Sequence, residues 1–150
     1  MATAEYAGRR VDVWGYSGGY TGELAASLFS DMVCAGILKL SQRWVIAFLT
    51  ELGSVRFNPT RGSTFVTRLR DGELRTEGDV SAAFLLAADE MIDQMAAEES
   101  DDTPDDETYA SAELLEVGLL ANGKLSLTVA ITSLSGASRT VLVPVAAEAL

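Results

Sequence analysis

The C-terminal third of the chain alternates between apolar and polar residues, and this period of two constrains the fold more than any other feature. In residues 125–131 every second residue is a large aliphatic one: Leu125, Leu127, Val129 and Ile131. A weaker alternation precedes this run in Leu115, Val117 and Leu119, and a third strand segment, Thr140–Val143, follows it. The intervening dipeptides Asn122-Gly123 and Ser135-Gly136 are turn signals. The pattern predicts a three-stranded antiparallel meander with one apolar face.

Upstream of the meander, apolar residues recur at helical spacing in two segments, 41–52 and 79–97. The first, with Ser41 as its predicted N-cap, has one apolar stripe: Leu40, Trp44, Phe48 and Leu52. The second, with Asp79 as its predicted N-cap, has another that Leu85 and Ile92 widen: Val80, Phe84, Ala88, Met91 and Met95. A short helix is predicted at 63–70, ended by Asp71-Gly72. Because the apolar sheet face needs cover, we expect an α+β fold with two main helices packed on the C-terminal meander.

The chain divides into an N-terminal arm, residues 1–27, and a domain, residues 28–150. The arm has a weak strand pattern at Val11–Trp14, and four glycines in residues 15–22 predict a loop without a nucleotide-binding motif. Between the second helix and the meander, residues 98–107 hold seven acids in ten positions. We expect this segment to be a solvated linker.

Charge and composition exclude several function classes. The formal net charge is −11, which disfavours nucleic acid and anionic membrane surfaces but suits a protein with basic patches. The chain has no histidine, the usual general base and metal ligand. Its one cysteine, Cys34, lies in an apolar stretch and is expected to be buried, which favours a reducing site of synthesis. We find neither a signal peptide nor a membrane-spanning run, and expect a soluble protein without a cofactor.

Three short motifs follow one another in the N-terminal half: Gly36–Gln42, Phe48–Gly53 and Asn58–Gly62. They match a glutamine-bearing helix, a Leu-Thr-x-x-Gly step and a Pro-x-x-Gly turn. Together with the amphipathic helix and the meander, their order resembles the short wedge protein family of contractile phage tail baseplates. That family has a relative in type VI secretion baseplates, and some members are labelled lysozyme-like. The resemblance spans residues 33–145.

The resemblance implies a structural, non-enzymatic role in the virion, in a protein made in the host cytoplasm. Six copies would surround the tail hub, one per wedge, binding other wedge proteins and the tail sheath, with the tail hub or tube as a further partner. The expected contact with the first sheath ring is β-augmentation, in which an open sheet edge accepts a neighbour's strand. We predict that this edge lies at residues 113–119 or 138–145.

The resemblance also suggests partner-binding residues. The family's Glu-Pro-Arg tripeptide, which docks on the helical core bundle of the wedge, falls here on Glu107, Thr108 and Tyr109, and only the glutamate matches. The contact is therefore lost or shifted to Tyr109 and its neighbours. In the arm, Trp14 is either an interface anchor or packed on its own domain. The adjacent Arg9 and Arg10 are candidates for an acidic neighbour.

Two alternatives use the acidic residues. A lysozyme-like glycoside hydrolase acting on the cell wall during infection needs a carboxyl group with a raised pKa. Glu51, beside Phe48 and Leu52, is the best candidate for that carboxyl group. A calcium site in residues 101–107 lacks the EF-hand spacing and has Pro104 in its middle. We therefore predict no catalytic, cofactor-binding or metal-binding residue, and keep the hydrolase as the alternative function.

Overall fold

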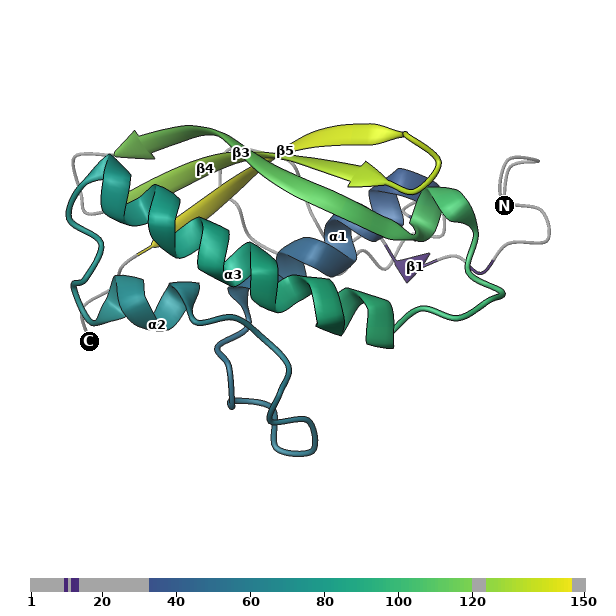
Figure 1. The fold of residues 1–150 in the computed structure, drawn as a ribbon, viewed down its shortest axis with the longest axis horizontal. Coiled ribbons are helices and arrows are strands. Elements are labelled where there is room, and N and C mark those ends of the chain that lie inside the picture. The colour runs from purple at the N-terminus through teal and green to yellow at the C-terminus, as the bar shows by residue number, and fades with distance from the viewer. Residues whose placement is uncertain (1–9, 11, 14–32, 120–123, 147–150) are drawn as a thin grey trace.

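Helices lie against one face of a long antiparallel sheet in the computed structural model of the chain, which describes residues 10, 12–13, 33–119 and 124–146 (Figure 1). The predicted α+β fold is confirmed. The elements in chain order are β1 (Asp12–Val13), β2 (Val33–Cys34), α1 (Gly36–Leu49), α2 (Phe65–Arg70), α3 (Glu77–Ala97), η2 (Asp105–Glu107), β3 (Tyr109–Leu119), β4 (Lys124–Ser133) and β5 (Ser138–Ala146).

The sheet is the predicted meander, with strand order β3-β4-β5 and antiparallel pairing throughout. The alternating residues of β4 all point into the core, and Val141, Val143 and Val145 of β5 join them. The β4–β5 turn contains Gly136 at φ +87°, a conformation that favours glycine. The other predicted turn residues, Asn122-Gly123, lie outside the described residues.

In β3 the predicted alternation is wrong at Leu115, whose side chain is 52% exposed. The pairing register shifts between Leu114 and Glu116, so Leu115 occupies a β-bulge without a direct partner in β4. Leu114 turns toward the core instead, and Val117 packs on the core as the alternation predicted. One extra residue in the strand therefore reverses the face that a strict period of two predicts.

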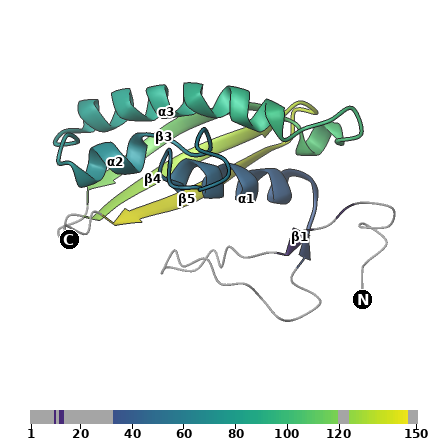
Figure 2. The same ribbon diagram turned by 90° about the horizontal axis from the view of Figure 1, so that it is seen from below.

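The core lies between the sheet and the two long helices, α1 and α3 (Figure 2). Aromatic rings occupy its centre. Trp44 and Phe48 of α1 stack with ring centroids 4.7 Å apart, Phe65 of α2 lies 4.9 Å from Phe48, and Phe84 of α3 lies 5.7 Å from it. All four side chains are buried. The short helix α2, predicted at 63–70, thus contributes one aromatic side chain to the common core.

Helix α1 begins five residues before the predicted start, so the assignment of Ser41 as its N-cap is wrong. The residue that precedes the helix is Ala35, which has no side chain able to cap it. Ser41 instead lies inside the helix, where its hydroxyl donates to the Ile37 carbonyl at 2.7 Å. The predicted periodicity holds up to Phe48, but the helix ends at Leu49 and Leu52 is partly exposed beyond it.

Helix α3 begins at Glu77, and its N-cap is Thr76 rather than the predicted Asp79. Thr76 and Asp79 form a capping box, in which the threonine hydroxyl accepts from the Asp79 N–H and the aspartate carboxylate accepts from the Thr76 N–H. The predicted stripe of α3 packs on the core, with Ala83 and Ala87 beside it. Leu85 and Ile92 were expected to widen that stripe. They are 68% and 50% exposed, so this expectation is wrong.

Candidate functional site

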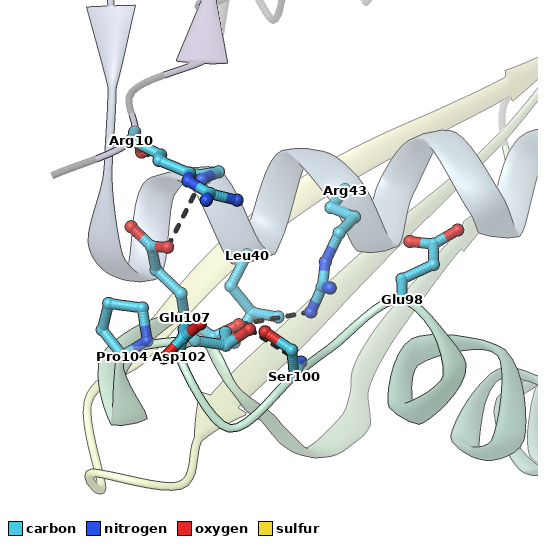
Figure 3. Close-up of a pocket in the computed structure, with 10 residues that line it drawn as sticks. Arg10, Leu40, Arg43, Glu98, Ser100, Asp102, Pro104 and Glu107 are labelled. Atoms are coloured by element: carbon cyan, nitrogen blue, oxygen red, sulfur yellow. Dashed lines mark hydrogen bonds and ion pairs between the residues drawn. The ribbon is translucent and has the colours of Figure 1, made fainter.

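Glu107, a predicted partner-binding residue, lies beneath the first turn of α1 and is only 6% exposed (Figure 3). Its Oε1 accepts from the Gly36 N–H at 2.9 Å, and its Oε2 lies 3.4 Å from Lys39 Nζ. The start of a helix carries unsatisfied N–H groups and a partial positive charge, which a carboxylate stabilises. Glu107 therefore supplies the cap that Ala35 does not, from 71 residues further along the chain.

The segment 98–107 is held by basic residues, so the expectation of a solvated linker is wrong for three of its acids. Glu99 pairs with Arg43 of α1 and also accepts from the Tyr109 N–H at 2.8 Å. Glu98 pairs with Arg61, and Glu107 pairs with Lys39. These contacts bind the segment to α1 and to the loop that follows it.

A pocket of about 480 Å³ opens between α1 and this acidic segment. Its polar lining comes from both sides, and Figure 3 shows Arg10, Arg43, Asp102 and Glu107 around it. The Lys39 ammonium also donates to the Arg10 carbonyl at 2.9 Å, which ties the described part of the arm to α1. The pocket thus combines basic and acidic groups that largely pair with each other, and its outer rim carries the exposed Arg10 and Asp102.

The other predicted partner-binding residues follow Glu107 directly. The Thr108 hydroxyl donates to the Pro104 carbonyl at 3.0 Å, and the Thr108 carbonyl accepts from the Leu134 N–H at 2.8 Å. Burial raises the pKa of the Tyr109 phenol. The Trp44 indole lies near enough to oppose this pKa shift, but its N–H does not reach hydrogen-bond geometry with any described residue.

The structure therefore brings Glu107, Thr108, Tyr109 and Arg10 to one end of α1, while Arg9 and Trp14 lie outside the described residues. The arm meets the domain where Asp12 and Val13 pair with Cys34 and Val33, and Cys34 is buried as predicted. Lys39, Arg43 and Glu99 belong to the same site but were not identified from the sequence. Lys39 and Arg43 are spaced i, i+4 and therefore share one side of a helix. The predicted helix start at Ser41 left Lys39 outside the helix, so this spacing was not recognised.

Glu51, the candidate general acid of the hydrolase alternative, is bound in an ion pair. Arg70 donates to its Oε2 at 2.9 Å, and the Thr67 hydroxyl donates to its Oε1. The Arg70 guanidinium lowers the pKa of Glu51, whereas a general acid requires a raised pKa. Its surroundings thus favour an ionised structural carboxylate.

Comparison with models of protein families, with curated proteins and with solved structures finds no match for this chain. Within the described residues, no helix is long and apolar enough to cross a membrane. The same part of the chain contains no cluster of three metal-ligating side chains.

Proposed function

We propose that the protein is a structural component of a contractile phage tail baseplate that joins wedge subunits to the first sheath ring around the tail hub. The proposal includes six copies per baseplate in the virion, no enzymatic activity, and no nucleic acid or membrane partner. The resemblance over residues 33–145 supports it, and the α+β fold with a terminal meander is compatible with it.

The observation that carries the proposal is the border of the sheet at β3. The strand order ends at β3 on one side, and none of the described strands pairs with its outer border. Such a border presents main-chain N–H and C=O groups that a strand from another subunit can pair with. The strand order ends at β5 on the other side, and none of the described strands pairs with the outer border of β5 either. We propose strand addition at residues 113–119, with residues 138–145 as the second candidate edge.

In this proposal the contact with a wedge subunit lies around the pocket between α1 and residues 98–107. The Glu107 carboxylate is occupied within the chain, so it would position this surface rather than meet the partner directly. Exposed Arg10 and Asp102 at the rim, with half-exposed Tyr109, are the groups that would contact a wedge subunit. Rim charges of this kind mainly set orientation and register.

The experiment uses a host strain that produces a contractile particle encoded next to this chain. Deletion of the gene should yield tubes without attached sheath in electron micrographs, and the wild-type gene should restore attachment. The substitution Leu115→Lys adds an edge charge at an exposed bulge and should fail to restore it, because an edge lysine opposes strand pairing. Leu134→Lys, in the exposed β4–β5 turn, is the matched control and should restore attachment.

Normal particles from the deletion strain would overturn the baseplate role. Full restoration of sheath attachment by Leu115→Lys would contradict strand addition at β3. A purified protein that hydrolyses isolated cell walls, with loss of hydrolysis in Glu51→Gln, would establish the glycoside hydrolase in place of the structural role.

A further inference from the structure

The loop between α1 and α2 presents an aromatic side chain to solvent. Phe57 is 91% exposed, and the Arg56 guanidinium lies 5.5 Å from the centre of its ring. Figure 1 shows residues 50–62 extending beyond α2 and α3 on the side away from the sheet. Phenylalanine and arginine are both enriched in protein interfaces relative to the rest of the surface. The end of this loop therefore has the composition of an interface anchor.

Hydrogen bonds hold the loop in one shape. The Asn58 N–H donates to the Val55 carbonyl at 3.1 Å, and Arg56 and Phe57 are the two central residues of the turn that this bond closes. At the base of the loop, the Gln94 side chain of α3 accepts from a loop N–H at 2.8 Å and donates to the carbonyl of the same residue at 2.7 Å. A loop that is already ordered loses little conformational entropy when it binds.

A hollow of about 520 Å³ lies beside the base of the same loop. Leu52 and Pro59 of the loop and Ala97 of α3 form its apolar walls, and two acids also line it. Both oxygens of Glu90 accept hydrogen bonds within the chain. Asp93 is exposed and makes neither an ion pair nor a hydrogen bond with any residue that the structure describes. The hollow thus combines apolar walls with one available carboxylate.

The end of the loop and the hollow carry opposite charges. Residues 53–62 contain two arginines and no acid. Arg61 pairs with Glu98, whereas Arg56 forms no ion pair among the described residues. An aromatic ring with a cation beside it is complementary to an apolar hollow with a carboxylate beside it. The chain therefore contains both halves of one contact.

We propose that the hollow binds the Phe57 ring of a second copy of this chain, with Arg56 of that copy facing Asp93. Because the loop and the hollow adjoin each other, two copies related by a two-fold axis would each insert a ring into the hollow of the other. The contact is small, so the dimer is weak and transient. The inference concerns the free chain and does not rest on the proposed baseplate role.

Sedimentation equilibrium of the full chain at physiological salt tests the proposal, because this salt screens the repulsion between two copies of net charge −11 beyond about 8 Å. We expect an equilibrium of monomer and dimer at concentrations up to about 1 mM. Phe57→Ser should weaken the dimer at least about tenfold, since both inserted rings are lost. The matched control Leu134→Ser changes an exposed leucine in the β4–β5 turn and should leave the dimer unchanged.

Charge reversal tests the pairing of Arg56 with Asp93. Arg56→Asp and Asp93→Arg should each make the chain monomeric, because like charges then meet at both contacts of the dimer. An equimolar mixture of the two variants should dimerise as the wild type does, because each contact again joins a cation to an anion. Asp101→Arg makes the same charge change at an exposed acid elsewhere and should leave the dimer unchanged. Circular dichroism and melting temperature verify that every variant folds.

Three results would overturn the proposal: a wild-type chain that stays monomeric up to about 1 mM, a dimer that Phe57→Ser does not weaken, or a mixture of the two charge variants that stays monomeric. None of these variants changes residues 113–119, and none of the measurements reports sheath attachment. Failure of the dimer is therefore distinguishable from failure of strand addition at β3.

Discussion

At the scale of single residues, Glu107 shows how one side chain joins distant parts of the chain. Its carboxylate is buried, lies at the positive end of α1, and contacts both a backbone N–H and an ammonium group. A buried charge is tolerated when such partners replace the water it has lost. The residue that the family resemblance assigned to a partner is a structural link within this chain.

Replacement of Glu107 by alanine should lower the free energy of unfolding by about 1–3 kcal/mol, since it leaves the Gly36 N–H without an acceptor in a buried place. Glu107→Gln should cost less, because its amide oxygen can still accept from Gly36 while the ion pair with Lys39 is lost. Urea unfolding of the three proteins measures the difference. Equal stability of the alanine variant and the wild type would show that water satisfies Gly36.

Gly62 is a second residue whose identity is imposed by its surroundings. Its φ is +112°, and a Cβ atom there would lie 2.5 Å from the Thr50 carbonyl oxygen. Gly62→Ala should therefore destabilise the fold by about 1–3 kcal/mol or more, through backbone strain and a backbone clash. Gly53 also has positive φ, at +86°, but open space around it, so Gly53→Ala should cost only about 1 kcal/mol. Thermal unfolding that ranks the two variants in the opposite order would contradict this account.

At the scale of elements, the two long helices differ in how the N–H groups of their first turn are capped. Helix α3 uses a local capping box, Thr76 with Asp79, whereas α1 depends on the distant Glu107. A local cap stabilises its helix independently of the rest of the fold, while a distant cap acts only when the two segments are assembled.

Thr76→Ala removes the hydroxyl that accepts from the Asp79 N–H and should lower the free energy of unfolding by about 0.5–2 kcal/mol. Thr76→Ser keeps that hydroxyl and serves as the control, with stability close to that of the wild type. Denaturant unfolding of both variants separates the effect on stability of losing the capping hydroxyl from the effect of losing the threonine methyl group.

Acid should destabilise the protein partly through Asp79 and Glu51. Backbone N–H groups of Arg75 and Thr76 lower the pKa of Asp79, and Arg70 lowers the pKa of Glu51. Because both pKa values are lower in the folded state, their stabilising contributions are complete above the ordinary values of 3.8 and 4.5. They are lost as the pH falls through the folded values. The fall in unfolding free energy between pH 7 and pH 3 should be smaller in Asp79→Asn than in the wild type.

At the scale of the whole molecule, the two faces of the helical layer distribute apolar residues unevenly. One side forms the aromatic core with the sheet, and the other exposes Leu85, Leu86 and Ile92 of α3 and the loop after α1, whose Phe57 is 91% exposed. Phe57 contacts the Arg56 guanidinium, 5.5 Å above its ring, whereas Phe48 packs among three other aromatic side chains.

Phe48→Ala should cost about 3–5 kcal/mol, because it removes a large buried side chain and leaves a cavity. Phe57→Ala should change stability by no more than about 0.5–1 kcal/mol, the range of an exposed cation–π contact. Guanidinium unfolding measures both. A large loss in Phe57→Ala would show that the loop packs on the domain in solution.

Local patterns were sufficient for the elements themselves: the alternation in residues 125–131, the stripe from Val80 to Met95, and the turn at Gly136 all gave correct predictions. These signals depend on neighbours within a few positions, which the chain order already specifies. Tertiary structure alone decided that Leu85 and Ile92 face outward, that a bulge exposes Leu115, and that Glu107 is buried under α1. Each of these outcomes depends on which distant segment occupies the neighbouring space, and no local period carries that information.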